Sequence, residues 1–585
     1  LYSFFNSRSV LKKWAERSAE PKSVELLQHK LGISSLLANL LVKRGLLNPD
    51  AVERFLSPKL RHLEDPFALA NMDLAISRIL QAREKKEKIL LIGDYDVDGI
   101  TSSVITRLAL ESLGMVVETI IPKRLSEGYG LTQKALERGL SNDNFGLVMA
   151  LDCGTNSLGE ANYLKSEGID LIVVDHHQLK GDQAADAILI NPHLQEDKGE
   201  PWRNLCTAGL CFKLVHALYK RARELNLPNS SELTPRDFLP LCAIGTLADL
   251  VPLKDENRIF SRFGIKRLFI DASPGLLALL AECGLDDSIE PETEDITYKL
   301  APRINACGRL NEPETAVSLL LEKNQKECKS LARQLTQFNE ERKGIEAKLT
   351  ADALAQAEEN FANQPAAVVC GTGDAWHPGV VGIVAGKLAN SLNKPCLVLA
   401  QAEGGEYCGS GRGVPGVNLV EILASCQDKL THWGGHPVAV GLGLKEDQLD
   451  GFIAEFLKAS KKSKSTDEQT SDLVIDAWVS KNDLRYELLD EINGLGPFGQ
   501  DNREPVLAIK RVSLESPVRK IGNGEHFQFS LRNSNGYIRG IAWRMADRIP
   551  EENQSIDLAF KLRKNYWNGR SSLQLVLEDW KPSDS

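Results

Sequence analysis

Short, mostly apolar runs recur through the first half of the chain and constrain its fold more than any other feature. They lie at residues 89–92, 116–121, 147–151, 171–174 and 187–190, and helical segments separate them. Strands of a parallel sheet are buried on both faces, so they appear as continuous apolar runs rather than as alternating ones. The pattern therefore predicts a doubly wound α/β domain over residues 66–320.

Acidic residues and histidines directly follow several of these predicted strands. Residues 94–99 read Asp-Tyr-Asp-Val-Asp-Gly, Asp152 follows the third run, and residues 175–177 read Asp-His-His. The carboxyl ends of parallel strands meet at one edge of a sheet, so these groups are expected to lie together. Carboxylates held away from water require hydrogen bonds or cations. The sequence therefore predicts a divalent-metal site at this edge.

The predicted ligands are four carboxylates and one imidazole, with two further residues in reserve. The ligands are Asp96, Asp98, Asp152, His176 and Asp249, and the reserve residues are Asp94 and His177. Such an oxygen-dominated set suits manganese or magnesium better than zinc. Taken singly, each acid has another interpretation, since Asp152 could cap a helix and Asp249 could pair with a cation. Four acids at the strand ends of one sheet favour the metal site.

An EF-hand-like calcium loop or a solvated turn is the alternative interpretation of residues 94–99. Ile100 and Thr101 lead directly into an apolar helix, and the later glutamate of a calcium loop is missing. The strand-end metal site is therefore the preferred interpretation.

The remaining chain divides into segments with different patterns. A helical layer is predicted for residues 1–65, a long helix for 321–361, a second α/β unit for 362–457 and a linker for 458–471. The long helix would span about 60 Å, which predicts that it connects two bodies. Short alternating strands over 472–585 predict a small barrel of the oligonucleotide-binding (OB) kind, with a β-sandwich as the alternative.

Composition narrows the functional class. The chain has 585 residues, a net charge of −10 and eleven cysteines without a Cys-x-x-Cys pair, which predicts a reducing compartment. No apolar run approaches the roughly 20 residues that cross a bilayer, so we expect a cytoplasmic protein without membrane contact. Any nucleic-acid surface must be a local basic patch within an acidic whole.

Four motifs, in this order and spacing, resemble those of the DHH phosphoesterases. They are 94–99 (Asp-Tyr-Asp-Val-Asp-Gly), 151–154 (Leu-Asp-Cys-Gly), 175–177 (Asp-His-His) and 245–249 (Gly-Thr-Leu-Ala-Asp). Further similar segments are 122–130, 301–310, 377–382, 409–412 and 434–441. The resemblance extends from about residue 30 to the end, and it is greatest to bacterial single-strand-specific exonucleases. It implies a DHH domain, the long helix, a DHH-associated domain and an OB-like barrel.

The resemblance also implies a two-metal centre. Asp152 would bridge the ions, Asp96 would serve the first, and the second would be held by Asp98, His176 and Asp249. Ile92 stands where some relatives have a histidine ligand, so the first ion would bind weakly, with Asp94 helping directly or through water. His177 would contact the scissile phosphate rather than a metal ion, which makes it a catalytic candidate together with Asp152.

Recognition of a DNA end requires groups other than the metal ligands. The resemblance implies as substrate-binding residues Arg124, Arg303, Arg309, Ser410, Arg412 and His436. Guanidinium groups suit a terminal phosphate because they form paired hydrogen bonds with it. In the barrel, the candidates for base stacking are Phe527, Phe529, Trp543, Tyr566 and Trp567, with Arg532, Arg544, Arg563 and Lys564 nearby.

The predicted function is a manganese- or magnesium-dependent exonuclease that degrades single-stranded DNA from its 5′ end to 5′-mononucleotides, in recombination and repair. One alternative is a phosphodiesterase of short oligonucleotides or cyclic dinucleotides, and another is a catalytically silent DNA-binding scaffold. Retention of all five metal ligands disfavours the scaffold. We expect a monomer, and the resemblance implies cooperation with single-strand binding protein and a helicase.

Overall fold

A computed structural model describes residues 12–583, apart from 125, 142, 182–185, 196–198, 374–375, 402–404, 464–472, 535 and 568–569. The chain forms two compact units. Among the described residues, the large unit contains 64–251 and 255–463, and the small unit contains 12–63, 252–254 and 473–583.

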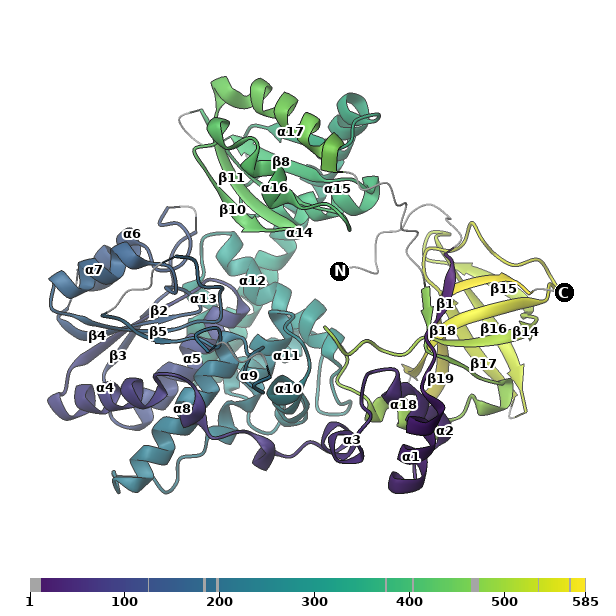
Figure 1. Cartoon of the computed structure of the whole chain (residues 1–585), viewed down its shortest axis with the longest axis horizontal. Coiled ribbons are helices and arrows are strands. Elements are labelled where there is room, and N and C mark those ends of the chain that lie inside the picture. The colour runs from purple at the N-terminus through teal and green to yellow at the C-terminus, as the bar shows by residue number, and fades with distance from the viewer. Residues whose placement is uncertain are drawn as a thin grey trace. The chain divides into compact units, whose positions relative to one another are not determined.

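A five-stranded parallel sheet forms the centre of the large unit, with strand order β3-β2-β4-β5-β6. The strands are β2 (Lys88–Gly93), β3 (Val117–Ile120), β4 (Phe145–Leu151), β5 (Asp170–Val174) and β6 (Ile188–Ile190). The sheet has helices on both faces, with α6 (Gln133–Leu140) and α7 (Leu158–Ser166) on one and α4 (Met72–Lys85) and α8 (Thr207–Glu224) on the other (Figure 1). The predicted doubly wound fold is confirmed.

The loop after β2 is folded tightly against the start of α5 (Val97–Ser112). The Asp96 side chain caps this helix by accepting a hydrogen bond from the Gly99 backbone N–H at 3.1 Å. A Cβ atom on Gly99 would lie only 2.4 Å from the Asp94 carbonyl oxygen, so only glycine fits there. The loop therefore holds its acidic side chains in a fixed arrangement at the strand end.

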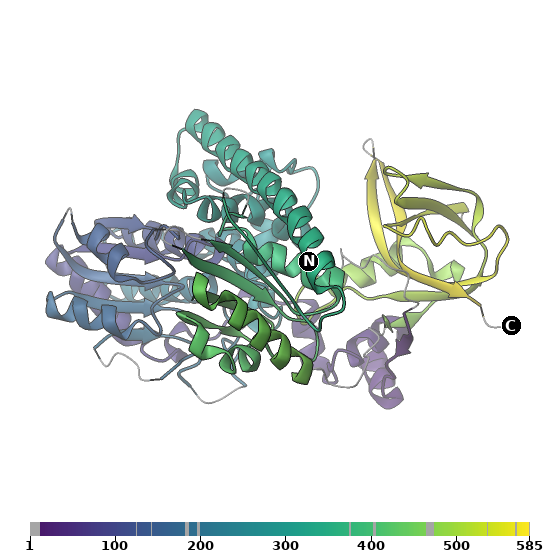
Figure 2. The ribbon, with the colours of Figure 1, turned by 90° about the horizontal axis from the view of Figure 1, so that it is seen from above.

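A helical layer completes the first part of the large unit. Its members are α9 (Leu239–Ala248), α10 (Asp255–Arg267), α11 (Pro274–Glu282), α12 (Ala301–Arg309) and α13 (Glu314–Leu321). The long helix α14 (Gln325–Phe361) has 37 residues and packs against α11, α12 and α13, and also against α15 (Val381–Leu392) and β7 (Ala367–Gly371) (Figure 2). It begins at Gln325 because the Asn324 side chain caps the Lys326 and Glu327 backbone N–H groups.

The second part of the large unit is a mixed sheet with strand order β10-β11-β9-β8-β7. Besides β7, its strands are β8 (Cys396–Gln401), β9 (Glu406–Arg412), β10 (His432–His436) and β11 (Ala439–Lys445), accompanied by α16 (Leu419–Ala424) and α17 (Leu449–Ser463). Helix α17 extends into the segment predicted as a linker, and the rest of that segment from residue 464 lies outside the described residues.

The small unit combines the C-terminal barrel strands with the N-terminal helices. A seven-stranded sheet has the order β13-β14-β18-β19-β17-β16-β15. Its strands are β13 (Ala477–Trp478), β14 (Leu507–Val512), β15 (Glu515–Ile521), β16 (His526–Asn533), β17 (Gly536–Ala542), β18 (Ile556–Trp567) and β19 (Arg570–Pro582), and α18 (Tyr486–Gly494) lies between β13 and β14.

The N-terminal helices share one hydrophobic core with this sheet. They are α1 (Pro21–Leu31), α2 (Ser35–Val42) and α3 (Pro49–Leu56). Leu27 and Leu40 are fully buried there together with Leu489 and Phe560. The segment predicted as a helical layer also contains β1 (Trp14–Glu16), which pairs in parallel with β12 (Leu473–Ile475). Throughout the described residues, no helix is long and apolar enough to cross a membrane.

The shared core predicts that an N-terminal substitution destabilises the C-terminal barrel. Leu40→Ala removes a fully buried side chain from α2 and should lower the free energy of unfolding of the small unit by about 2–5 kcal/mol. Denaturant unfolding followed by tryptophan fluorescence measures this change. Leu47→Ala, at a leucine that is 48% exposed, is the matched control and should have little effect. A barrel transition unaffected by Leu40→Ala would contradict the shared core.

Candidate metal centre

The predicted ligands converge at the carboxyl edge of the parallel sheet in three overlapping groups, one of which consists of Asp152, His176 and His177. Ligand atoms of Asp94, Asp96 and Asp152 lie within 4.8 Å of one another. A second group with the same spacing consists of Asp98, His176 and Asp249. Asp249 was expected at a strand end, and this expectation is wrong, because the residue ends helix α9. The C-terminal end of α9 thus places Asp249 at the same edge of the sheet.

His176 is surrounded by carboxylates. Its Nε2 atom lies 3.5 Å from Asp152 Oδ1, 3.5 Å from Asp249 Oδ2 and 3.9 Å from Asp98 Oδ2. Burial, followed by the charge of His177, lowers the pKa of His176 to about 4. The imidazole is therefore neutral at physiological pH, which is the form that binds a metal ion.

The surroundings of the clustered carboxylates disfavour their ionised forms. Burial, together with the charges of Asp98 and Asp96, raises the pKa of Asp152 well above its usual range. The pKa of Asp94 is likewise raised by burial and by Asp96. Asp94 is 1% exposed, and its Oδ1 atom has no hydrogen-bond partner among the described residues. An orphaned buried oxygen beside repelling carboxylates fits bound hard cations such as Mn²⁺ or Mg²⁺.

His177 has a different environment from its neighbour. Its Nδ1 atom lies 2.7 Å from Asp175 Oδ1, and its Nε2 atom lies 3.3 Å from the Tyr129 hydroxyl. Burial opposes a charge on this ring, but the hydrogen bond to Asp175 and the charge of Asp175 outweigh it and raise the pKa of His177 to about 9. His177 is therefore a hydrogen-bond donor with a positive charge beside the cluster.

Arginines gather close to the acidic cluster, on α12 and on the mixed sheet. The Arg309 guanidinium donates to the Gly379 carbonyl oxygen at 2.8 Å. Burial, followed by the charge of Arg124, lowers the pKa of Arg309 to about 10, and Arg342 and Arg412 act in the same direction. Arg124 itself lies over the Tyr95 ring, 5.3 Å from its centroid. These neighbouring guanidinium charges favour an anion as their partner.

Ser410 and Arg412 lie on β9 beside the first turn of α15. A Cβ atom on Gly382 would be 3.2 Å from Arg412 Nη2 and 3.3 Å from Ser410 Oγ. The glycine therefore leaves room for both side chains at the start of the helix. Backbone N–H groups at a helix N-terminus, an arginine and a hydroxyl together suit a phosphate.

Two of the predicted substrate-binding residues are placed differently. Arg303 donates hydrogen bonds to Thr336 Oγ1 at 3.1 Å and to the carbonyl oxygens of Lys299 and Glu282, which engages its guanidinium in packing of α12. His436 is an exposed residue at the end of β10, paired in register with Ala439. The contacts of these two residues therefore do not connect them to the metal-ligand groups.

Two barrel aromatics expected to stack on bases are core residues, so that part of the prediction is wrong. Phe527 is 0% and Phe529 is 3% exposed, because alternate residues of β16 face the interior. Trp543 and Tyr566 are exposed, as is Tyr537, which was not among the predicted residues. Arg563 pairs with the Glu504 carboxylate, and the side chain of Trp567 lies outside the described residues.

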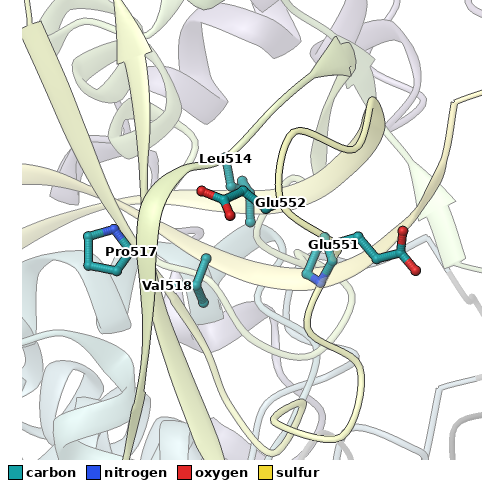
Figure 3. Close-up of a pocket in the computed structure, with 6 residues that line it drawn as sticks. Leu514, Pro517, Val518, Glu551 and Glu552 are labelled. Carbon is teal, nitrogen blue, oxygen red and sulfur yellow. The ribbon is translucent and has the colours of Figure 1, made fainter.

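A hollow on the small unit is unrelated to the cluster. Its lining comes from Leu514, Pro517 and Val518 and from the 550–552 segment (Figure 3). Glu551 and Glu552 belong to this lining, and their carboxylates would repel a phosphodiester backbone. The hollow therefore does not suit nucleic acid.

Comparisons with known proteins place the chain in a family. Models of the DHH family N-terminal domain, the DHHA1 domain and the RecJ OB domain match residues 88–246, 363–462 and 475–579. The single-stranded-DNA-specific exonuclease RecJ of Bacillus subtilis (strain 168) is 35% identical over 573 residues, which cover 97% of this chain and 70% of the relative. The chain belongs to the RecJ family. RecJ of Escherichia coli (strain K12) is 30% identical, covering 93% of this chain and 95% of that relative.

Solved RecJ structures have the same architecture. The crystal structure of RecJ in complex with Mn²⁺ from Thermus thermophilus is similar with a TM-score of 0.82 at 27% identity, covering 98% of this chain and 80% of that one. The Mg²⁺ complex from the same organism gives a TM-score of 0.77 at 26% identity, covering 98% and 79%. The predicted DHH, DHH-associated and OB-like parts are thereby confirmed.

Three residues near the metal-ligand groups and the arginines were not among the site candidates chosen from the sequence. Tyr129 lies within the similar segment 122–130, and Asp175 belongs to the Asp-His-His motif, so a motif signal existed for both. Arg342 on α14 lies in no motif, and only the packing of α14 reveals its proximity to Arg309.

The raised pKa of Asp152 predicts that bound metal reverses the order of stability of the wild type and an Asp152 variant. Since ionised Asp152 is destabilising in the folded protein, Asp152→Asn without divalent cations should unfold at a higher temperature than the wild type at pH 7.5. With saturating Mn²⁺ the wild type should be the more stable protein, because the variant loses a ligand. Calorimetry with Mn²⁺ and with EDTA gives the unfolding temperatures of both proteins under each condition.

The matched control for this comparison is Asp186→Asn, which alters an exposed carboxylate paired with Lys165. It should respond to Mn²⁺ as the wild type does. If the Asp152 variant kept the full stabilisation by Mn²⁺, Asp152 would not be a ligand.

Proposed function

We propose that this chain is an exonuclease that uses two Mn²⁺ or Mg²⁺ ions to hydrolyse single-stranded DNA from the 5′ end into 5′-mononucleotides, in recombination and repair. The observation that carries the proposal is the pair of ligand groups around Asp152, with an arginine cluster beside it. Both the names of the relatives and the OB domain support single-stranded DNA as the substrate.

Asp152 would bridge the two ions. Asp96, helped by Asp94, would hold the first ion, and the second would be held by Asp98, His176 and Asp249. When bound, such a pair of ions lowers the pKa of the attacking water and withdraws charge from the phosphate oxygens. Ile92 is fully buried in β2 and offers no ligand atom to the first group. The first ion would therefore bind more weakly than the second.

His177 would stabilise the phosphate in the transition state. Its Nδ1–H is directed to Asp175, which fixes the orientation of the ring and maintains the charge. The Nε2–H can then exchange the Tyr129 hydroxyl for a nonbridging phosphate oxygen as its acceptor. A charged donor directed at a developing negative charge contributes more to the transition state than to the ground state.

The arginine cluster would bind the 5′-terminal phosphate. Arg124 and Arg412 each place a positive charge near the buried Arg309, and Ser410 adds a hydroxyl donor beside Arg412. A doubly charged terminal phosphate relieves that repulsion better than an internal phosphodiester does. This preference for an end explains exonuclease action rather than cleavage within the strand.

The OB domain would hold the strand through exposed aromatic residues. Trp543 and Tyr566 are 50% and 45% exposed, and the Lys564 Nζ atom lies 4.9 Å from the Tyr566 ring centroid. Base stacking beside a cation suits binding without sequence preference. We also propose a monomer in the cytoplasm that cooperates with single-strand binding protein and a helicase, which the family resemblance supports.

Strands labelled at either end test polarity and substrate class. With Mn²⁺ or Mg²⁺, a 5′-labelled single strand should release labelled mononucleotide at once, whereas a 3′-labelled strand should shorten progressively. A blunt duplex should resist, and Asp249→Ala should reduce the rate at least about hundredfold, since it removes a ligand. Immediate release of mononucleotide from the 3′ label, or cleavage of dinucleotides alone, would contradict the proposal.

Arg412 provides a test of end recognition. Arg412→Ala should raise KM for a 5′-phosphorylated strand about ten- to hundredfold, because one charge-assisted contact is lost. The same substitution should raise KM for a 5′-hydroxyl strand much less. Arg107→Ala, at an arginine paired with Glu111 on α5, is the control and should change neither KM. Equal losses on both strands would place Arg412 outside the 5′-phosphate site.

A further inference from the structure

Thr207, the first residue of α8, touches two of the metal-ligand carboxylates. Its hydroxyl donates to Asp152 Oδ1 at 2.8 Å, and its backbone N–H donates to Asp98 Oδ2 at 2.8 Å. The neighbouring Ala208 N–H donates to Asp98 Oδ1 at 2.8 Å. One residue therefore presents donors to oxygens on both the bridging aspartate and its neighbour.

Both carboxylate oxygens that Thr207 contacts face His176. Asp152 Oδ1 lies 3.5 Å and Asp98 Oδ2 lies 3.9 Å from His176 Nε2. Thr207 is 0% exposed, so no water competes for these hydrogen bonds. A carboxylate only accepts hydrogen bonds, and the hydroxyl proton is therefore directed at Asp152.

Asp152 has an unusual backbone conformation. Its φ of 64° lies in the left-handed region, which an aspartate adopts rarely. The side chain leaves the end of β4 in a direction set by this conformation. A hydrogen bond to one oxygen fixes the remaining rotation of the carboxylate.

We infer that Thr207 is a positioning residue, whose hydroxyl fixes Asp152 Oδ1 for the ion held by Asp98, His176 and Asp249. This inference rests on the metal site of the proposed function. Hydrogen bonds to ligand carboxylates commonly change metal affinity about ten- to hundredfold. The Thr207 hydroxyl fixes the orientation of this oxygen, and a bound ion would then neutralise the charge of the buried carboxylate.

Thr207→Val tests the inference, because valine keeps the shape of the side chain and removes only the hydroxyl. The Mn²⁺ affinity of the second site should fall about tenfold or more, measured by titration of the full-length protein with calorimetry. Thr207→Ser restores the hydroxyl and should restore most of the affinity. Thr350→Val on α14 is the matched control, since its hydroxyl donates to the Glu346 carbonyl oxygen and its loss should leave Mn²⁺ binding unchanged.

Pulsed electron paramagnetic resonance assigns the effect to one site. Nitrogen hyperfine coupling from an imidazole reports an ion beside His176 or His177, because the group of Asp94, Asp96 and Asp152 consists of carboxylates. In Thr207→Val this coupled signal should decrease at one equivalent of Mn²⁺. Nuclease activity should recover as Mn²⁺ is raised, which a misfolded variant would not do.

The outcomes separate this inference from the proposed function. If the wild type binds no Mn²⁺ at this cluster, the proposed function fails. If the wild type binds two ions and Thr207→Val binds them equally well, the positioning role is refuted while the proposed function stands. A lower unfolding temperature with unchanged Mn²⁺ affinity also refutes it.

Discussion

Mutual repulsion among buried carboxylates is the constraint on which the rest of this structure depends. Asp94, Asp98 and Asp152 are each no more than 2% exposed, and they lie together with Asp96 at one edge of a parallel sheet. Like charges at this separation and burial are stable only if they are protonated or neutralised by cations. The fold creates a concentration of negative charge that two divalent ions would neutralise.

The surrounding elements position this charge rather than reduce it. Gly99 allows the loop after β2 to close tightly, the N-terminus of α8 donates to Asp98, and α9 delivers Asp249. The charges of Arg124 and Arg412 act on the buried Arg309 guanidinium and lower its pKa. In the proposed function, cations would neutralise the acids and the phosphate of a DNA end would neutralise these arginines.

Much of the fold and of the metal site could be predicted from the sequence. The apolar runs indicated the strands of the parallel sheet because both faces are buried, and the strand-end acids are local signals that need no knowledge of packing. Strand β15 has a weak sequence signal, since its segment Glu515–Ile521 contains a proline and charged residues.

Other features depend on long-range packing, which leaves no local signal. Whether Phe527 and Phe529 face inward depends on the register of β16 with its neighbours, and a one-residue shift would reverse it. The sharing of a core between α2 and the barrel joins segments separated by several hundred residues. Thr207 belongs to no motif, and only the approach of α8 to the end of β4 brings its hydroxyl to Asp152.

The most direct test of this account is the anomalous diffraction of crystals grown with Mn²⁺. The account predicts two anomalous peaks on either side of Asp152, one beside Asp94 and Asp96 and the other beside Asp98, His176 and Asp249. The peak beside Asp94 and Asp96 should have the lower occupancy when Mn²⁺ is limiting. Full-occupancy Mn²⁺ elsewhere with no density at this cluster would contradict the account.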